Sequence, residues 1–433
     1  MAAQATHQVV IVGGGFAGVS TAKQLAADGI SVLLIDQHNY HQFQPLIYQV
    51  ATAQIAVPDV ARPLRAIFRG DPVEVKTATV AAVDAESRTV TTADGLTYRG
   101  EILVLATGGE ANFFDIPGAA EHAFPLYSVD DAARLRSRLL GALDTADRSQ
   151  DYIDRGVLNV VIVGAGPTGV ETAGAVAESL RYVVPSYLPT SVATQGNVYL
   201  VDMIPTVLAA FTERSQEYAK RKLRSSGVQL RLDVGVTEVR KDGVVLADGS
   251  HIPSKTVVWA GGLKAGRLIA NTGLPQGKGG RIDVDPDLRA PGFPGVYVLG
   301  DSANLTDAAG NHLPQLGSVA QQAGKWAARN IKADLAGAPR QPFKYQDKGI
   351  MAMIGRGAAV AELGSKHRQM AGVVAFAAWL GVHLVLLSGL RERIGACVSW
   401  IWDYLSRRRP QILVDRPEAY AIDWEDDSGL GGR

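Results

Sequence analysis

The stretch "VIVGGGFAGVS" at residues 10–20 returns, with few changes, as "VIVGAGPTGVE" at residues 161–171. Each copy begins with β-branched residues typical of a buried parallel strand and runs through a glycine loop into apolar residues at helical spacing. The spacing G-x-G-x-x-G between a strand and a helix allows a tight turn, a close approach of a diphosphate, and close packing of helix on strand. We therefore predict two dinucleotide-binding units in one chain.

An acidic residue ends the strand that follows each loop. "SVLLID" ends in Asp36 and "NVYLVD" ends in Asp202. A carboxylate at this place can accept the ribose hydroxyls of a dinucleotide. The segment "DMIPTVL" after the second strand carries no arginine, and a 2′-phosphate would meet like charge there. The second loop is therefore predicted to prefer NADH over NADPH.

Bulk composition sets further bounds. The 433 residues suggest two to four domains, and 47% apolar with 20% charged residues is typical of a globular protein. A formal net charge of zero gives no indication of a nucleic-acid partner. The single cysteine, Cys397, excludes an internal disulfide and fits a reducing compartment. We expect no secretory signal in "MAAQATHQ", no metal site, and a structural role for His38 and His41.

Two further segments indicate which nucleotide each loop holds. "EILVLATGGE" at residues 101–110 and "GVYVLGDSAN" at residues 295–304 are predicted strands that run into glycine turns. "VVWAGG" at residues 257–262 matches the first of them in the second half. With these segments the chain resembles the flavoproteins with two dinucleotide-binding domains. That resemblance implies FAD on the first loop and on the later Gly-Asp, and NAD(P)H on the second loop.

The resemblance gives a set of expected contacts for each cofactor. For FAD they are Gly13, Gly15, Phe16, Ala17, Gly18, Asp36, Gln44, Pro45, Ala106, Thr107, Gly108, Gly300 and Asp301. For NADH they are Gly164, Gly166, Pro167, Thr168, Gly169, Asp202 and Gly261.

The order of the segments predicts an α/β fold in which one Rossmann-like domain is inserted into another. We expect an FAD-binding domain in residues 1–120 and 285–340, and an NADH-binding domain in residues 121–284. A carboxyl-terminal region, residues 341–433, would hold the site of the electron acceptor and anchor the protein to a membrane. The turns "DGLTY" and "ADGSH", residues 94–98 and 247–251, predict hairpins at equivalent places.

The membrane expectation rests on the carboxyl-terminal sequence. Residues 371–390 form an apolar stretch with one ionisable residue, His383, and are long enough to span a bilayer. Beyond it, Trp400, Ile401, Tyr404 and Leu405 fall on one predicted helical face, and residues 407–409 are arginines. This pattern is typical of a helix lying in the lipid interface. A buried helical hairpin or a dimer interface is the alternative.

With this end included, the chain resembles type II NADH dehydrogenase over about residues 8–415. The segments that carry the resemblance are "YHQFQPLIYQVAT" (40–52), "GAGPTGVE" (164–171) and "FKYQDKGIMAMIGRGAAV" (343–360). The resemblance implies a homodimer on the cytoplasmic face of the cell membrane. It would pass electrons from NADH through FAD to a quinone, without proton pumping.

The same resemblance names the expected quinone-side residues. Glu171 would donate or relay a proton, with Gln322 and Lys348 beside the quinone; a helix dipole acting on Glu171 is the alternative. Ser318 stands where the family has a glutamine.

A lack of paired cysteines excludes the disulfide reductases and sulfide:quinone reductases. An NADH-dependent reductase of a small electron-transfer protein and an NADH-sensing flavoprotein remain alternatives.

Overall fold

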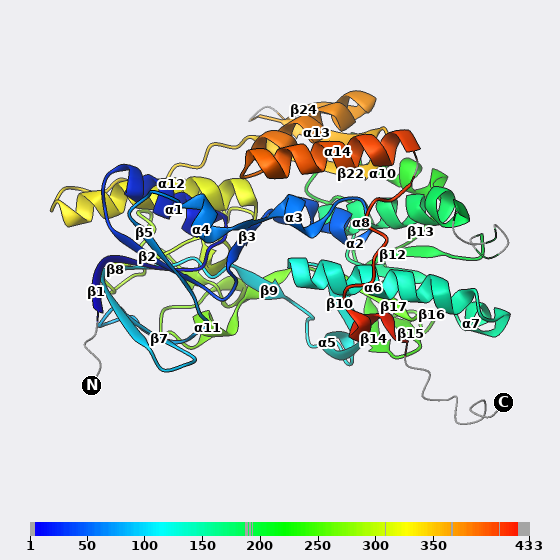
Figure 1. Ribbon diagram of the computed structural model, residues 1–433, viewed down its shortest axis with the longest axis horizontal. Coiled ribbons are helices and arrows are strands. Elements are labelled where there is room, and N and C mark those ends of the chain that lie inside the picture. Colours follow the sequence, from blue (N-terminus) through cyan, green and yellow to red (C-terminus); the bar gives the residue numbers. More distant parts are fainter. Residues whose placement is uncertain are drawn as a thin grey trace. The chain divides into compact units, whose positions relative to one another are not determined.

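The computed structural model describes residues 5–186, 189, 192, 194–307, 309–364, 367–406 and 408–422, and the chain forms two compact units (Figure 1). The first is built from described residues of 1–42, 61–110 and 263–347. The second is built from those of 43–60, 111–262 and 348–433. Each unit has its own parallel sheet and one of the two glycine loops, which confirms the predicted α/β class.

The first unit is organised around a sheet whose parallel strands lie in the order β5–β2–β1–β8–β20. These strands are β1 (Ala5–Val12), β2 (Val32–Asp36), β5 (Val73–Thr77), β8 (Thr97–Leu105) and β20 (Val296–Val298). The antiparallel strands β7 (Thr89–Thr92) and β6 (Val80–Asp84) extend the sheet beyond the start of β8. The β7–β8 turn contains Gly95 at φ +85°, as the hairpin prediction requires.

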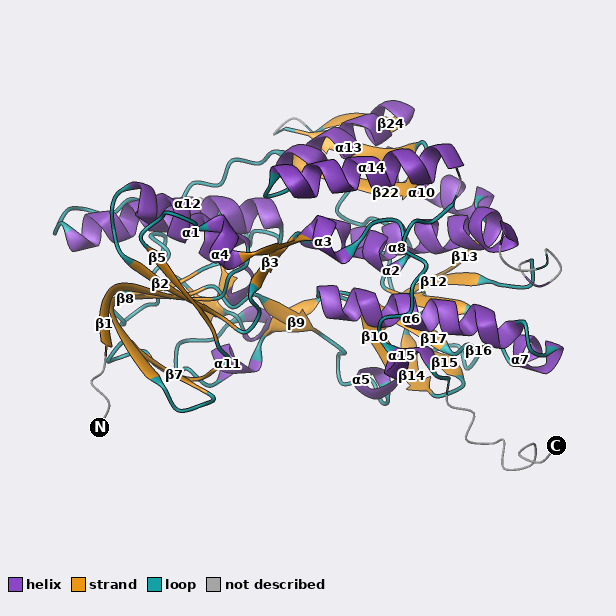
Figure 2. Cartoon of the chain, viewed as in Figure 1, coloured by secondary structure: helices purple, strands orange, loops and turns teal. Residues whose placement is uncertain are grey.

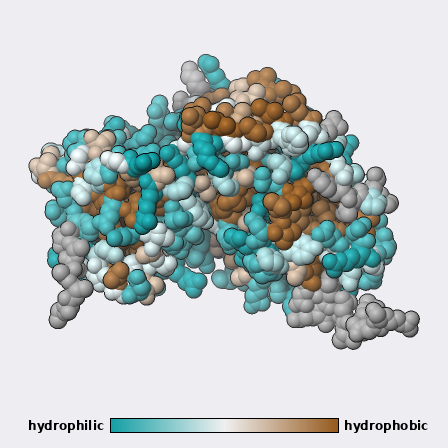
Figure 3. Space-filling view, in the orientation of Figure 1, coloured by the Kyte–Doolittle hydropathy of each residue, from teal (hydrophilic) through white to brown (hydrophobic). Residues whose placement is uncertain are grey.

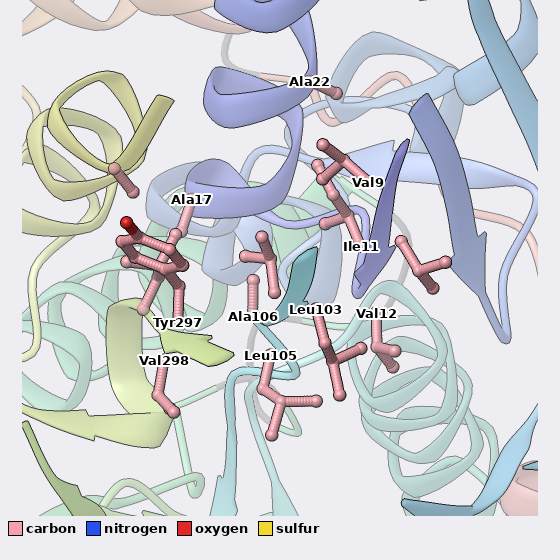
Figure 4. Close-up of a cluster of buried hydrophobic side chains, with 14 of the residues drawn as sticks. Val9, Ile11, Val12, Ala17, Ala22, Leu103, Leu105, Ala106, Tyr297 and Val298 are labelled. Atoms are coloured by element: carbon pink, nitrogen blue, oxygen red, sulfur yellow. The ribbon is translucent and has the colours of Figure 1, made fainter. Parts of the chain in front are cut away.

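Two helices pack side by side in this unit (Figure 2). They are α1 (Phe16–Ala27) and α12 (Gly317–Leu335). Their backbones approach so closely at Gly324 that a Cβ there would collide with the Ala17 carbonyl oxygen. Beneath α1, Val9 and Ile11 of β1 and Leu103 and Leu105 of β8 form part of the buried core (Figure 4).

The remaining short elements of the first unit complete its loops. They are β3 (Tyr40–Gln42), β4 (Ala61–Pro63), α4 (Leu64–Ile67), β9 (Gly109–Ala111), β18 (Leu263–Ala265), α11 (Arg267–Ala270), β19 (Ile282–Asp283), β21 (Ala303–Asn304) and the 3-10 turns Lys278–Gly280 and Gly300–Ser302.

The second unit contains a parallel sheet in the order β10–β17–β11–β12–β13. Its strands are β10 (Ala123–Pro125), β11 (Val160–Val163), β12 (Val198–Asp202), β13 (Val228–Leu232) and β17 (Thr256–Trp259). Its helices and helical turns before the carboxyl-terminal region are Gln44–Leu46, α2 (Ile47–Ala51), α3 (Val57–Val60), α5 (Ala119–His122), α6 (Val129–Ala146), α7 (Gln150–Asp154), α8 (Pro167–Glu178), Ser179–Val183, Val184–Ser186 and α10 (Glu213–Ser225).

Two antiparallel sheets accompany this parallel sheet. One is formed by β14 (Val236–Arg240), β15 (Gly243–Leu246) and β16 (His251–Pro253). Gly249 in its β15–β16 turn has φ +82°, which confirms the second predicted hairpin. The other is formed by β22 (Gly349–Gly355), β23 (Ala358–Leu363) and β24 (Arg368–Gly372).

Three helices end the described chain: α13 (Val373–Leu386), α14 (Leu390–Ser406) and α15 (Pro417–Tyr420). The apolar stretch 371–390 is not one continuous helix, because its first residues close β24 and the chain turns after Leu386. The 14 residues of α13 extend about 21 Å, less than the roughly 30 Å of a hydrocarbon core. In the described ranges no helix has both the length and the apolar character needed to cross a bilayer.

The predicted lipid face of α14 was partly wrong. Ile401 and Leu405 are 54% and 82% exposed, but Trp400 is only 5% exposed and Tyr404 is half-buried. Trp400 turns inward because its indole N–H donates to Gln49 Oε1 at 2.7 Å. Arg409, expected at lipid head groups, is also buried. Arg408 is exposed, and Arg407 lies outside the described residues.

Candidate functional site

The first glycine of each loop occupies a conformation that other residues rarely adopt. Gly13 has φ +107° and Gly164 has φ +103°. A Cβ at Gly13 would collide with the carbonyl oxygen of Ala106, and one at Gly164 with that of Ala260. The tight turn therefore brings each loop against the end of the neighbouring strand, β8 or β17.

The second and third glycines of each loop differ in how much space surrounds them. A Cβ at Gly18 or Gly169 would collide with the carbonyl oxygen of the loop's own first glycine. Apart from the adjoining stretch of chain, no heavy atom of the described residues lies within 4 Å of the Cβ position at Gly15 or Gly166. Because Gly15 and Gly166 are also the N-caps of α1 and α8, no cap side chain fills that space. Both loops thus leave open the place where a diphosphate meets a helix N-terminus.

The two strand-end acids make the same contacts in both units. Asp36 Oδ2 accepts the Gly14 N–H at 2.5 Å, and Asp202 Oδ2 accepts the Ala165 N–H at 2.5 Å. Each acid therefore ties its strand to the glycine loop, and each carboxylate keeps lone pairs for a further donor. Burial raises the pKa of Asp36 although two backbone N–H groups favour its charged form.

The histidine next to the first loop has the structural role that was predicted for it. The His41 Nδ1 lies 2.9 Å from the Gly14 carbonyl oxygen, and its ring meets Phe16 edge-on. Burial lowers the pKa of His41, so the ring is neutral. His38, which is partly exposed, stacks on Tyr40.

Three strand ends meet at the carboxyl edge of the first sheet, at Gly13, at residues 106–108 and at Gly300–Asp301. Leu299 N–H donates to Leu105 O at 2.9 Å, and the hydroxyls of Thr107 and Ser302 lie 2.9 Å apart. A small hollow beside them is lined by a set that includes Arg281, Gly300, Asp301, Gln315 and Ala320.

This hollow contains a polar atom with nothing to bind. Gln315 Nε2 is buried and has no hydrogen-bond partner among the described residues. An amide, the Arg281 guanidinium and an open glycine loop suit the diphosphate and polyol parts of FAD. The residues of the first unit therefore fit FAD.

The remaining predicted cofactor residues lie as follows. Ala17 is buried and packs near Gly300, while Phe16 packs against Gly317. Gln44 and Pro45 form a 3-10 turn and belong to the second unit, unlike the other predicted FAD residues. Pro167 and Thr168 are the exposed first residues of α8. Gly261 follows β17, beside the Trp259 indole.

Among the described acids of the second unit, Glu171 has the most strongly shifted pKa. It is only 8% exposed, and its Oε1 accepts the Met353 N–H from β22 at 3.0 Å. Burial raises its pKa to about 8, although the Met353 N–H and the Trp379 indole favour the charged form. A helix dipole would lower the pKa instead, so burial is the larger influence on this carboxyl. Glu171 is mostly protonated at pH 7.

Four aromatic rings of the second unit pack together near Glu171. We call this group, Tyr48, Trp379, His383 and Trp400, the aromatic wall. Trp379 and His383 stack with ring centroids 3.8 Å apart, and Trp379 meets Tyr48 and Trp400 at 6.3 Å. Burial lowers the pKa of His383 to about 4, so it stays neutral. Burial, with a smaller contribution from the Glu171 charge, raises the pKa of Tyr48. The wall is therefore uncharged at neutral pH.

One polar atom of the wall is unpaired. The Trp379 indole nitrogen is buried and makes no hydrogen bond of ordinary geometry with the described residues. It is nevertheless close enough to Glu171 to lower that residue's pKa. A buried donor beside a protonated acid leaves hydrogen-bonding capacity for a small polar ligand.

A largely buried ionic cluster, defined as Glu178, Arg356, Asp403 and Arg409, forms around Glu178, which lies on α8 two turns after Glu171. Arg409 Nη1 is 3.1 Å from Asp403 Oδ2, and Arg356 Nε is 3.1 Å from Glu178 Oε1. Arg356 also donates to the Tyr404 and Asp403 carbonyl oxygens. Breaking such a cluster leaves a buried charge without a partner. The cluster thus holds α14 against α8 and β22.

Of the other predicted quinone-side residues, only Lys348 belongs to the same unit as Glu171. Gln322 belongs to the first unit, where its side-chain amide exchanges two hydrogen bonds of 3.0 Å with the Gln346 backbone. Ser318 lies 3.1 Å from the Tyr345 hydroxyl. Lys348 is exposed just before β22, five residues from Met353, which is roughly 16 Å along a strand.

Sequence reasoning missed the aromatic wall and the ionic cluster. Their members come from segments up to about 350 residues apart, so neither periodicity nor motif spacing joins them. One signal was present: Trp379 and His383 are four residues apart on a helix, and His383 is the single ionisable residue of the apolar stretch.

The chain is similar to proteins of known families. The family model of the pyridine nucleotide-disulphide oxidoreductases matches residues 7–324. The type II NADH:quinone oxidoreductase Ndh of Mycobacterium tuberculosis is 36% identical over 96% of this chain and 92% of its own. The chain belongs to the type II NADH:quinone oxidoreductases. The resemblance found in the sequence is thereby confirmed.

More distant relatives of these oxidoreductases agree. The type II NADH:quinone oxidoreductase of Staphylococcus saprophyticus is 27% identical over 82% of this chain and 89% of its own. The structure of NDH2 from Plasmodium falciparum in complex with NADH covers 94% of this chain and 99% of its own, with a TM-score of 0.86 at 19% identity. That structure supports the shared fold.

Proposed function

We propose that this protein oxidises NADH and reduces a quinone, with FAD bound to the first unit. Membership of the type II family supports the reaction. The observation that carries the assignment is the buried, protonated Glu171 behind an uncharged aromatic wall, in the unit that holds the second glycine loop. When bound, FAD accepts a hydride from NADH and passes two electrons on to the quinone.

The chain's own residues hold the two nucleotides. The loop at Gly13–Gly18, with residues 106–108 and Gly300–Asp301, would hold FAD. The loop at Gly164–Gly169 would hold NADH, with Asp202 accepting its ribose hydroxyls. Asp202 also makes NADH the preferred donor, because a 2′-phosphate would meet like charge.

Glu171 would supply a proton to the quinone. Reduction of a quinone to a quinol consumes two electrons and two protons. Because Glu171 Oε1 accepts the Met353 N–H, its proton is favoured on Oε2. A pKa of about 8 keeps that proton in place at neutral pH while allowing its transfer. Gln322 and Lys348 stay candidates for contacts to the quinone.

We also propose that α13 and α14 attach the protein to a membrane. The buried face of α14 is unusually polar, since it carries Glu392, Ser399 and Asp403. Its exposed face is mostly apolar, with Arg391 at its start, and carries Leu390, Ile394, Val398, Ile401 and Leu405. Figure 3 shows the resulting brown band at α13 and α14. An apolar helix face that is exposed to water is typical of a membrane or protein interface.

The remaining parts of the assignment stay proposals. A lone cysteine favours the reducing, cytoplasmic side of the cell membrane. A homodimer is expected from the family resemblance.

The reaction is tested with purified protein. We expect yellow material with one FAD per chain and NADH oxidation that depends on a short-chain quinone. A reductase of a small electron-transfer protein would instead need that protein as acceptor, and a sensing flavoprotein would turn over with neither. Colourless protein that stays colourless after FAD is added would contradict the proposal.

A further inference from the structure

A groove of about 270 Å³ lies in the second unit, between α10 and β24. Its α10 side is formed by Arg214, Ser215, Glu217, Tyr218 and Arg221, and its β24 side by Gln369, Met370 and Ala371. The volume is far above the roughly 15 Å³ that one water needs. This groove has no part in the proposed electron transfer.

The α10 side of the groove is basic. Arg214, Tyr218 and Arg221 stand four and three residues apart, and so share one face of the helix. Both arginines are exposed, and neither makes an ion pair within 4.0 Å in the described part of the chain. Glu217 also lines the groove, but Lys220 Nζ binds its carboxylate at 2.9 Å. Two guanidinium groups are therefore available to an anion.

The β24 side is less polar and leads directly to the apolar surface. Met370 and Ala371 line the groove, and Gly372 joins them to α13. The first two residues of α13, Val373 and Val374, are 69% and 65% exposed. The groove thus has guanidinium groups on one side and an exposed apolar helix at its end.

We infer that this groove binds the phosphate of an anionic phospholipid, whose acyl chains lie along the start of α13. Arg214 and Arg221 would bind the phosphate oxygens, with the Tyr218 hydroxyl as a further donor. Met370 and Val373 would contact the glycerol and upper acyl carbons. The charge and the apolar continuity together fit an anionic amphiphile better than a free anion. The inference rests on the proposed membrane association.

The test compares membrane binding of the full-length FAD-loaded protein and two double variants. Arg214→Gln/Arg221→Gln removes both groove charges. Arg224→Gln/Arg231→Gln removes two exposed arginines of the same unit that do not line the groove, and is the matched control. Co-sedimentation is measured with phosphatidylglycerol vesicles and with neutral phosphatidylcholine vesicles.

We expect the wild type to prefer phosphatidylglycerol vesicles. The groove variant should lose about 30-fold of that preference, at about 1 kcal/mol for each basic side chain, and the control less than threefold. Equal losses in both variants would assign the effect to general surface charge and overturn the groove site. Equal wild-type binding to both vesicles would overturn the groove alone, and binding to neither would overturn membrane association as well.

A titration separates the lipid from a free anion. A soluble short-chain phosphatidylglycerol and inorganic phosphate are each titrated into the wild type and the groove variant by calorimetry. We expect the lipid to bind the wild type at least tenfold more tightly than phosphate, and to lose that binding in the groove variant. Phosphate binding as tightly as the lipid would overturn the lipid assignment.

Discussion

The helices α1 and α8 follow the same glycine loop, yet the position two residues after the last glycine differs. In α1 this position is Ser20, and in α8 it is Glu171. Ser20 Oγ donates to the Gln321 carbonyl oxygen of α12 at 3.0 Å. Glu171 lies instead against β22, where burial raises its pKa. The same position of the repeat therefore contributes to helix packing in the first unit and carries an acid with a raised pKa in the second.

What covers the helix decides this difference. α1 packs on α12, where Gly324 lets the two backbones meet and the Ser20 hydroxyl finds a carbonyl acceptor. α8 packs on β22, where a Cβ at Gly174 would collide with the Ile354 carbonyl oxygen. The strand offers one N–H to Glu171, whose side chain is buried. The same nucleotide loop can thus be followed by a buried acid with a raised pKa in one unit and by a packing residue in the other.

The largest effects are expected at the third glycine of each loop, Gly18 or Gly169, and the two loops should behave alike there. Gly18→Ala or Gly169→Ala places a Cβ against a backbone carbonyl that cannot move freely, and should cost more than about 3 kcal/mol or prevent folding. Gly15→Ala and Gly166→Ala, with open space at the Cβ, are the matched controls and should lower the thermal midpoint far less than the other two variants. Equal midpoints in all four variants would contradict the packing account.

The same two control variants also distinguish nucleotide binding in the first unit from nucleotide binding in the second. Gly15→Ala should lower the bound FAD content, because its methyl group enters the space left for a diphosphate. Gly166→Ala should leave FAD content unchanged and raise the KM for NADH about tenfold. Loss of FAD in Gly166→Ala would contradict the assignment of the two loops.

The Glu171 carboxyl should make stability depend on pH. Its pKa is about 8 in the folded state against an ordinary value of 4.5, so the folded state binds more protons between these two values. The free energy of unfolding should therefore fall by a few kcal/mol as pH rises from 4.5 to 8. Glu171→Gln should lack this fall, measured by denaturant titration across that range. Parallel curves for both proteins would contradict a neutral Glu171.

The strand-end acid of the second unit should control donor choice. Asp202→Asn keeps one acceptor oxygen for the Ala165 N–H but removes the charge that repels a 2′-phosphate. The ratio of kcat/KM for NADH over NADPH should fall about tenfold. Asp36→Asn is the control, and should change FAD content and not this ratio. A wild-type preference for NADPH would defeat the assignment.

The smallest effect is expected at Ser20, the residue of α1 that corresponds to Glu171 of α8. Ser20→Ala removes one hydrogen bond to Gln321 and should cost about 1 kcal/mol. The rate of quinone reduction should stay unchanged in a steady-state assay. A slowed quinone step would show that this position affects the chemistry in both units.

The features that depend on local sequence could be predicted. The strand–loop–helix units, the acids at Asp36 and Asp202 and both hairpin turns follow from short stretches, because apolar runs, glycine spacing and turn chemistry act over a few residues. The family resemblance pointed to Glu171 as well. It could not give the residue's protonation state, which depends on β22 and α13 from the other end of the chain.

The carboxyl-terminal region shows where sequence reasoning fails. Trp400 and Tyr404 are apolar enough for a lipid face, but Gln49 and Arg356 draw them inward through contacts with distant segments. Arg409 matches a head-group contact by position, yet Asp403 pairs with it in the interior. Hydropathy assigns each residue by its own type, whereas partners from elsewhere in the chain decide which face is buried.

Rapid mixing of Glu171→Gln in two half-reactions tests the central claim most directly. The amide keeps the shape of the side chain and an acceptor for the Met353 N–H, but it carries no transferable proton. Reduction of the bound flavin by NADH should stay within about twofold of the wild type, while the reoxidation of the flavin by quinone should slow at least 100-fold. Unchanged rates in both half-reactions would contradict a proton-donating role for Glu171.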